Sequence, residues 1–525
     1  MNITTNKFTI DNKLFLVIIG LMLTVFIFTN DGHRYTLDED MAQQQTIRIV
    51  TQEPHPMYVQ GKSKMLFEYP EMTPHSWAPI CLNAIFCSAA NIGHSITEAP
   101  LVFINHNFHI ITKDTVVWTT DDFDDAHYVW WRNNLNPDFT FMELFYGPII
   151  SALSVGVFFL ICRTFNFRQR NSTMLALLFG FTTILWAYSK TSLNGVPVTF
   201  FVLLGFLFFR KFQKNQSPIN LIFCGASYGF GFLVRQDAFL FILPLFFFLI
   251  YEITQQHSKI KKILAFTLPL IPFYVIYRVI DFIRVGTTAE AGIATSASTV
   301  VSIGSGGNPI HEGIFGLLLS PGAGLLIFAP ILLTIFFAFP DFYKRNKREC
   351  ILLLSFAALF LIHYGPNGHW HGFVAWSARY LLPIVPFLLL PLGASLEKRK
   401  NLIFKSALLV LVTLGVFFNL AYVVQDVSWF VWTYPGSHTG LFGIALPTDP
   451  IYIHPRVLWD FEYSQLTHSI LKMIEDLQPD IFMLKLLGLQ VFATIFTAIL
   501  ASLSYLLISL TRSKSKLLNS VDSLE

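Results

Sequence analysis

An acidic triplet just beyond the first hydrophobic segment is the part of this sequence best suited to chemistry. The segment LFLVIIGLMLTVFIFT covers residues 14–29, and Asp38, Glu39 and Asp40 follow it closely. Carboxylates this close to a bilayer are costly unless they have partners or a task. A general base must reach an acceptor hydroxyl, and Asp38 or Glu39 is placed for that role. A structural alternative stays open, because Thr36 could cap a helix with Glu39 completing a capping box.

Basic residues at the ends of later hydrophobic segments form a second set. Lys190 lies in WAYSKTSLNG, Arg235 in FLVRQDAF and Arg379 in WSARYLLPIVP. A guanidinium can bind two phosphate oxygens at once, so we expect these cations to hold the phosphate of a lipid. Asp237 and Tyr380 adjoin them and are expected to line the same site. The alternative is that each cation only extends its charged end toward the membrane surface.

Histidines and glycines with aromatic residues form a third set, HYGPNGHWHGFVAW (363–376). His369 and His371 flank Trp370, and two imidazoles at this spacing could contribute to a divalent metal site. The sequence suggests no third ligand for them. Stacking on a sugar, hydrogen bonding to a substrate and a simple polar turn remain open. No cofactor is therefore certain, and a divalent metal is the one that the sequence suggests.

The composition shows which solvent surrounds these residues. Of the 525 residues, 53% are hydrophobic and 13% are charged, whereas soluble domains carry roughly 25% charged residues. A deficit of this size means that lipid is the solvent for most of the chain. The net charge is +3, and the basic residues fall in short clusters between hydrophobic segments. We therefore expect membrane lipid as a partner and no nucleic acid.

Twelve hydrophobic segments approach the length of about 20 apolar residues that a membrane span needs. They predict an all-α polytopic membrane protein with about 12 transmembrane helices. The segments are 14–30, 143–162, 173–189, 195–209, 218–234, 237–252, 263–280, 313–338, 350–364, 379–396, 402–424 and 484–510.

Basic clusters test this threading, since a cluster follows every even-numbered segment. These clusters are Arg163, Arg168 and Arg170; Arg210, Lys211 and Lys214; Lys259, Lys261 and Lys262; Lys344, Arg345, Lys347 and Arg348; Lys398, Arg399 and Lys400; and Arg512, Lys514 and Lys516. The positive-inside rule then places both termini in the cytoplasm. It predicts a multi-pass protein of the cell membrane, with the acidic triplet and the three cations on the extracytoplasmic face.

The same threading divides the chain. We expect residues 1–425 to form a transmembrane core that carries the candidate catalytic residues and includes an extracytoplasmic insert at 31–142. Residues 426–483 form an extracytoplasmic loop rich in aromatic residues, which we expect to help choose the acceptor. Residues 484–525 form the last span and a cytoplasmic tail.

The insert is expected to fold as a small mixed cap on the membrane. Its moderately hydrophobic stretch at 78–93 predicts an interfacial or re-entrant segment, and FHIITKDTVVW (108–118) has strand-like composition. Cys81 and Cys87 share this insert, so a disulfide between them is an open alternative to two free thiols.

Five motifs in order along residues 10–425 resemble the polytopic GT-C glycosyltransferases, which include protein O-mannosyltransferases and the aminoarabinose transferases of lipid A. Each motif is weak alone, and their order makes the set more specific. The motifs are YTLDEDMAQQQTIRI (35–49), WAYSKTSLNGVP (186–197), FLVRQDAFLFILP (232–244), GLLLSPGAGLLIFAPILL (316–333) and WSARYLLPIVPFLLLP (376–391).

The resemblance implies an enzyme that moves a hexosyl or pentosyl group from a polyprenyl- or dolichyl-phosphate sugar. The acceptor would be an extracytoplasmic hydroxyl of a glycan, lipid or protein, and transfer would invert the anomeric carbon. By position, Asp38 would be the base with Glu39 beside it, and Lys190, Arg235 or Arg379 would hold the lipid phosphate. Ala42 departs from the pattern, because many members carry a residue that packs the site there. A non-catalytic scaffold and a secondary transporter remain the alternatives.

Overall fold

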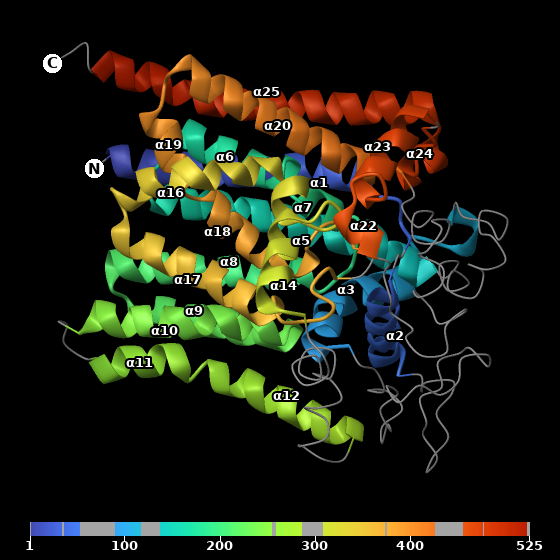
Figure 1. Ribbon diagram of the computed structural model, residues 1–525, viewed down its shortest axis with the longest axis horizontal. Helices are drawn as coiled ribbons and strands as arrows, with labels where there is room; N and C mark the ends of the chain where they lie inside the picture. Colours follow the sequence, from blue (N-terminus) through green and yellow to red (C-terminus); the bar gives the residue numbers. More distant parts are fainter. Residues whose placement is uncertain are drawn as a thin grey trace.

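The computed structural model describes residues 2–33, 36–52, 90–116, 137–254, 259–285, 308–372, 375–425, 455–475 and 477–521. Throughout these ranges the regular elements are helices, and no strand occurs in them. The long helices lie side by side in one bundle, and both ends of the chain are at the same end of it (Figure 1).

Within the ranges just given, eight helical segments are long and apolar enough to cross a membrane. They support a multi-pass membrane protein and confirm the predicted all-α polytopic class, while the count of twelve spans stays a prediction. The eight lie in α1 (Asn2–Phe28), α5 (Pro137–Thr164), α8 (Gly195–Asn215), η4 with α10 (Gln236–Ala238 and Phe239–Ile253), α11 with α12 (Lys259–Thr267 and Leu270–Val285), η6 with α18 and α19 (Arg379–Ile384, Val385–Leu389 and Leu392–Lys398), α20 (Leu402–Val423) and α25 (Leu489–Val521).

Shorter helices occupy the remaining predicted segments. They are α6 (Gln169–Phe181), α7 (Leu185–Tyr188), α9 (Pro218–Val234), α14 (Ile310–Leu319), α15 (Leu325–Phe328), η5 (Pro330–Thr334), α16 (Ile335–Tyr343), α17 (Lys347–Tyr364) and α24 (Phe482–Leu487). The segment predicted at 313–338 is interrupted after Ser320, because Pro321 has no N–H to continue a helix. There the Ser320 hydroxyl and the Gly322 N–H both donate to the Leu458 carbonyl of α22 (Pro455–Trp459).

Ion pairs join the basic clusters to one another at one end of the bundle. The pairs are Arg163–Asp11 (3.1 Å), Arg210–Glu349 (2.7 Å), Arg345–Glu397 (2.7 Å), Lys398–Asp341 (2.7 Å) and Arg348–Glu252 (3.7 Å). These pairs gather four of the six clusters, those of Arg163, Arg210, Arg345 and Lys398, with the start of α1, as the threading requires. That this end faces the cytoplasm stays a prediction.

Helices α2 (Leu37–Thr51) and α3 (Ile92–Phe108) lie at the opposite end of the bundle, away from the termini (Figure 1). They pack against each other, and both contact α5. Helix α2 begins at Thr36, whose hydroxyl accepts from the Glu39 N–H in a complete capping box. The start of α2, a helix of 15 residues, is thus fixed by the capping box between Thr36 and Glu39.

The sequence predicted a strand at 108–118. This prediction is wrong for residues 108–116, the part of the segment that the structure describes. Helix α3 ends at Phe108, and the short 3₁₀ helix η1 (Lys113–Thr115) follows a loop. The Asn105 side chain accepts from the Ile111 N–H at 2.8 Å and donates to the Ile111 carbonyl at 3.3 Å. These bonds satisfy the backbone groups that a strand would have paired. Residues 53–89, with both insert cysteines and most of the predicted interfacial stretch, lie outside the described residues.

Candidate active site

An acid from the first loop and a cation from a late span meet at the end of the bundle that carries α2. The Arg379 Nη1 atom lies 2.9 Å from the Asp38 Oδ2 atom. The Asp38 side chain is 49% exposed and that of Arg379 is 13% exposed. Arg379 is therefore packed against the protein, whereas Asp38 is open to solvent.

Glu39 is bound on all sides by the protein. It is fully buried, and its Oε2 atom accepts from the Thr36 N–H at 2.8 Å, which closes the capping box. Its Oε1 atom accepts from the Ser192 N–H at 3.2 Å. The capping alternative for this residue is thus confirmed. Of Asp38 and Glu39, Asp38 is the one whose carboxylate reaches solvent.

A buried polar group behind Glu39 was not predicted from the sequence. The Ser192 hydroxyl donates to the Glu143 Oε1 atom at 2.8 Å, and the Gln43 Nε2 atom donates to Ser192 Oγ at 2.7 Å. Gln43 also donates directly to Glu143. Two signals were available: Gln43 shares the Glu39 face of α2 at a spacing of four, and Glu143 is an acid within an apolar segment. These contacts fix α2 to α5 and to the loop after α7.

Close packing of α5 against that loop requires a glycine. A Cβ atom at Gly147 would lie 2.5 Å from the carbonyl oxygens of both Ser189 and Thr191. The absence of a side chain lets the loop pass next to α5, one turn beyond Glu143. The residues between these two carbonyls include Lys190, which is thereby directed into the protein.

Lys190 is fully buried, and its ammonium group has three acceptors. Its Nζ atom lies 2.6 Å from Asp31 Oδ2 and donates to the carbonyls of Val423 and Gln425 at 3.1 Å each. A lysine ammonium has three donors, so these contacts use all of them. Its role as a phosphate ligand stays a prediction, and the contacts favour Arg379 for that role.

Arg235 forms a buried two-bond pair with Asp237. Its Nε atom donates to Asp237 Oδ1 at 2.7 Å, and its Nη2 atom donates to the second carboxylate oxygen. Burial, the largest single influence, lowers the pKa of this guanidinium. Asp237 and the nearby tyrosines Tyr364 and Tyr380 together outweigh it, so the pKa lies above its ordinary value. The Nη2 atom also donates to the Tyr380 carbonyl at 3.3 Å. Arg235 therefore supports the turn that begins with Arg379.

Aromatic rings complete this support. The rings of Tyr364 and Tyr380 stack at 4.6 Å between centroids and 5° between planes, and the Tyr364 hydroxyl donates to Asp237 Oδ2 at 2.8 Å. The Arg379 guanidinium lies 5.2 Å from the Tyr380 ring centroid. The structure thus brings together five of the predicted residues, Asp38, Arg235, Asp237, Arg379 and Tyr380, at one end of the bundle.

The absence of a side chain at Gly372 leaves room for the Arg379 side chain. The φ angle of Gly372 is +69°, and a Cβ atom there would lie 2.6 Å from Arg379 Cγ. We expect Gly372→Ala to displace the guanidinium from Asp38 and to lower the activity of this site at least tenfold, because alanine is strained at this φ and meets the arginine stem. Steady-state kinetics would measure this, with Gly368→Ala as the control, since nothing lies within 4 Å of a Cβ atom there. Equal activity of the two variants would contradict the expectation.

Among the described residues, His369 and His371 belong to no group that could hold a metal ion. Their rings lie 6.2 Å apart and perpendicular, and within the described residues no third histidine, cysteine or carboxylate joins them. Trp370 between them is buried, 5.6 Å from the Trp459 ring, so it is a packing residue and not a platform for sugar. Their role in binding substrate stays a prediction.

A comparison with known protein families matches one part of the chain. Residues 141–279 match the family model described as dolichyl-phosphate-mannose-protein mannosyltransferase. This confirms the resemblance inferred from the motifs for that segment and supports a membrane glycosyltransferase. No curated protein matches the chain.

Two solved structures show weak similarity to this chain. ArnT from Cupriavidus metallidurans bound to undecaprenyl phosphate has 10% sequence identity and a TM-score of 0.49, over 94% of this chain and 77% of that chain. Its apo state has 12% identity and a TM-score of 0.40, over 95% and 77%. At these TM-scores the likeness is too low to support any assignment of substrate.

Proposed function

We propose that this protein transfers a sugar from a polyprenyl or dolichyl phosphate to an acceptor hydroxyl at the extracytoplasmic face of the membrane. The observation that carries the proposal is the 2.9 Å contact between Asp38 and Arg379, which pairs an exposed acid with an anchored cation. The family matched at 141–279 takes its name from a donor of this kind, a sugar on a lipid phosphate. A hexosyl or pentosyl group and a glycan, lipid or protein acceptor are all compatible with these contacts.

In the proposed reaction, Asp38 accepts the proton of the acceptor hydroxyl as its oxygen attacks the anomeric carbon. Arg379 holds one carboxylate oxygen, and the exposed part of Asp38 leaves the other for the acceptor. The bond from the anomeric carbon to the phosphate oxygen breaks on the opposite side, which inverts the configuration. Lipid phosphate leaves with both electrons of that bond.

The charge on the leaving phosphate needs a cation that is held in place before the reaction. Arg379 is that cation in our proposal, because its partner Asp38 is 49% exposed. The partners of Lys190 and Arg235 are the buried carboxylates of Asp31 and Asp237. Arg235 acts through Arg379, since its Nη2 atom holds the Tyr380 carbonyl and its own charge is balanced by Asp237. The lipid tail would position the donor in the bilayer and supply proximity.

A direct assay tests this proposal. Purified protein in lipid nanodiscs is incubated with a panel of polyprenyl-phosphate sugars, and donor consumption is followed by mass spectrometry. We expect one donor to be consumed with release of polyprenyl phosphate when an acceptor extract is added. Consumption of no donor by folded protein would favour a non-catalytic scaffold. Movement of solute across sealed vesicles without cleavage of a donor would favour a transporter.

A further inference from the structure

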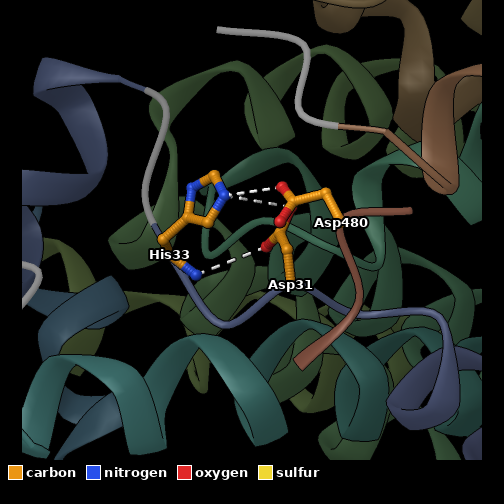
Figure 2. A group of neighbouring side chains, drawn as sticks. All are labelled: Asp31, His33 and Asp480. Carbon is orange, nitrogen blue, oxygen red and sulfur yellow. Dashed lines mark hydrogen bonds and ion pairs between the residues drawn. The ribbon is translucent and has the colours of Figure 1, made fainter. Parts of the chain in front are cut away.

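A buried group of two carboxylates and an imidazole lies beside the first loop. Asp31 and His33 follow α1, and Asp480 lies two residues before α24. Figure 2 shows the three side chains converging, with the imidazole facing the two carboxylates. The His33 Nε2 atom lies 2.8 Å from Asp480 Oδ2 and 3.8 Å from Asp31 Oδ2. Their side chains are 2%, 5% and 0% exposed, in the order His33, Asp480 and Asp31.

We propose that these three residues bind a divalent first-row transition metal of the Zn²⁺ class. One ligand atom from each residue lies within 4.8 Å of the others. A single ion at about 2.0–2.2 Å from each fits this spacing after small side-chain shifts. Imidazole with carboxylate ligands suits zinc and manganese better than calcium, which takes oxygen ligands. The three residues come from segments 447 positions apart, so the ion would link two distant parts of the chain.

Lys190 fits this site as a group that orients a ligand. Its ammonium donates to Asp31 Oδ2, the oxygen that also faces His33, and ligating carboxylates are commonly oriented by such hydrogen bonds. Lys485 approaches the other Asp480 oxygen, Oδ1, at 3.5 Å. In the hydrogen bond to Asp480, the His33 Nε2 atom carries a proton. The metal takes the place of that proton, which moves to Nδ1 or to solvent.

The backbone shows what the ion would hold together. The Asp480 N–H donates to the Val424 carbonyl at 2.9 Å, and the Phe482 N–H donates to the Asn30 carbonyl at 2.9 Å. The segment before α24 therefore runs along both the loop after α1 and the end of α20. A metal here would fasten that segment to the loop that leads into α2. This inference does not depend on glycosyl transfer.

Zinc binding by the full chain tests the proposal. Purified protein is stripped with a chelator, and Zn²⁺ is titrated by calorimetry, with metal content measured by mass spectrometry. We expect one Zn²⁺ per chain and a higher melting temperature with Zn²⁺, because an ion that binds only the folded state stabilises it. Asp480→Asn and His33→Gln should each weaken binding at least tenfold. His109→Gln, an exposed histidine after α3, should bind as the unchanged protein does.

Two results would overturn the proposal. One is folded wild-type protein that takes up no stoichiometric Zn²⁺ and shows no change in melting temperature. The other is equal Zn²⁺ affinity in wild type and the Asp480 variant. If both variants fail to fold, Co²⁺ added to the wild-type chain decides the matter. Visible d–d absorption at one equivalent supports the site, and a spectrum identical to free Co²⁺ rejects it and leaves an ion-paired junction.

Discussion

Asp38→Asn is expected to lower the rate of sugar transfer by about 10²–10⁴-fold, the usual contribution of a positioned general base. The asparagine keeps an oxygen that can accept from Arg379, so the local geometry is retained. It cannot take the proton of an acceptor hydroxyl. We expect kcat to fall while donor binding, measured by calorimetry with a non-transferable analogue, changes little.

A matched control separates catalysis from a general loss of charge. Asp114, in η1, is also an exposed acid that follows α3, and Asp114→Asn should leave kcat and KM unchanged. If Asp38→Asn transfers sugar at the wild-type rate, Asp38 serves only as the ion-pair partner of Arg379. The assignment of the base would then fail, although the proposed donor class would still stand.

The pattern of hydrophobic residues was sufficient to predict the helix bundle. It failed where polar contacts determine where a helix ends or how a loop is shaped. Each predicted hydrophobic segment contains a helix, because in lipid a helix satisfies its own backbone groups. The break after Ser320 begins at Pro321, and contacts with Leu458, which is 138 positions away, hold the chain there. The loop at Ile111 depends on bonds from Asn105. Neither contact leaves a signal in the periodicity of hydrophobic residues.

The part of the candidate site that was predictable is the part that depends only on which face of the membrane each segment end reaches. Placing Asp38 and Arg379 on one face required only the basic clusters and the count of segments. Partner choice was not predictable: Lys190 contacts Asp31 and not Asp38, because the loop that carries it is folded against Gly147. Asp480 joins His33 across nearly the whole chain, and a sequence read without the fold has no means to pair them.

The buried pair of Arg235 and Asp237 gives the largest expected effect on stability. Asp237→Asn should lower the free energy of unfolding by about 3–5 kcal/mol, because it leaves a buried guanidinium without its counter-charge. The asparagine still offers an acceptor to the Tyr364 hydroxyl, so the loss comes from the charge. Unfolding in detergent, followed by tryptophan fluorescence, measures the effect. Glu462→Gln, at an exposed turn, should change the same quantity by less than about 0.5 kcal/mol.

A double variant distinguishes the charge effect from the contribution to the site. Arg235→Met combined with Asp237→Asn removes both charges, so most of the lost stability should return. The Tyr380 carbonyl would still lack its donor, since Arg235 Nη2 supplies it. We therefore expect the double variant to fold stably yet transfer sugar more slowly, with the loss in kcat, because Arg379 starts on a less constrained turn. Full recovery of both stability and kcat would show that Arg235 does not position Arg379.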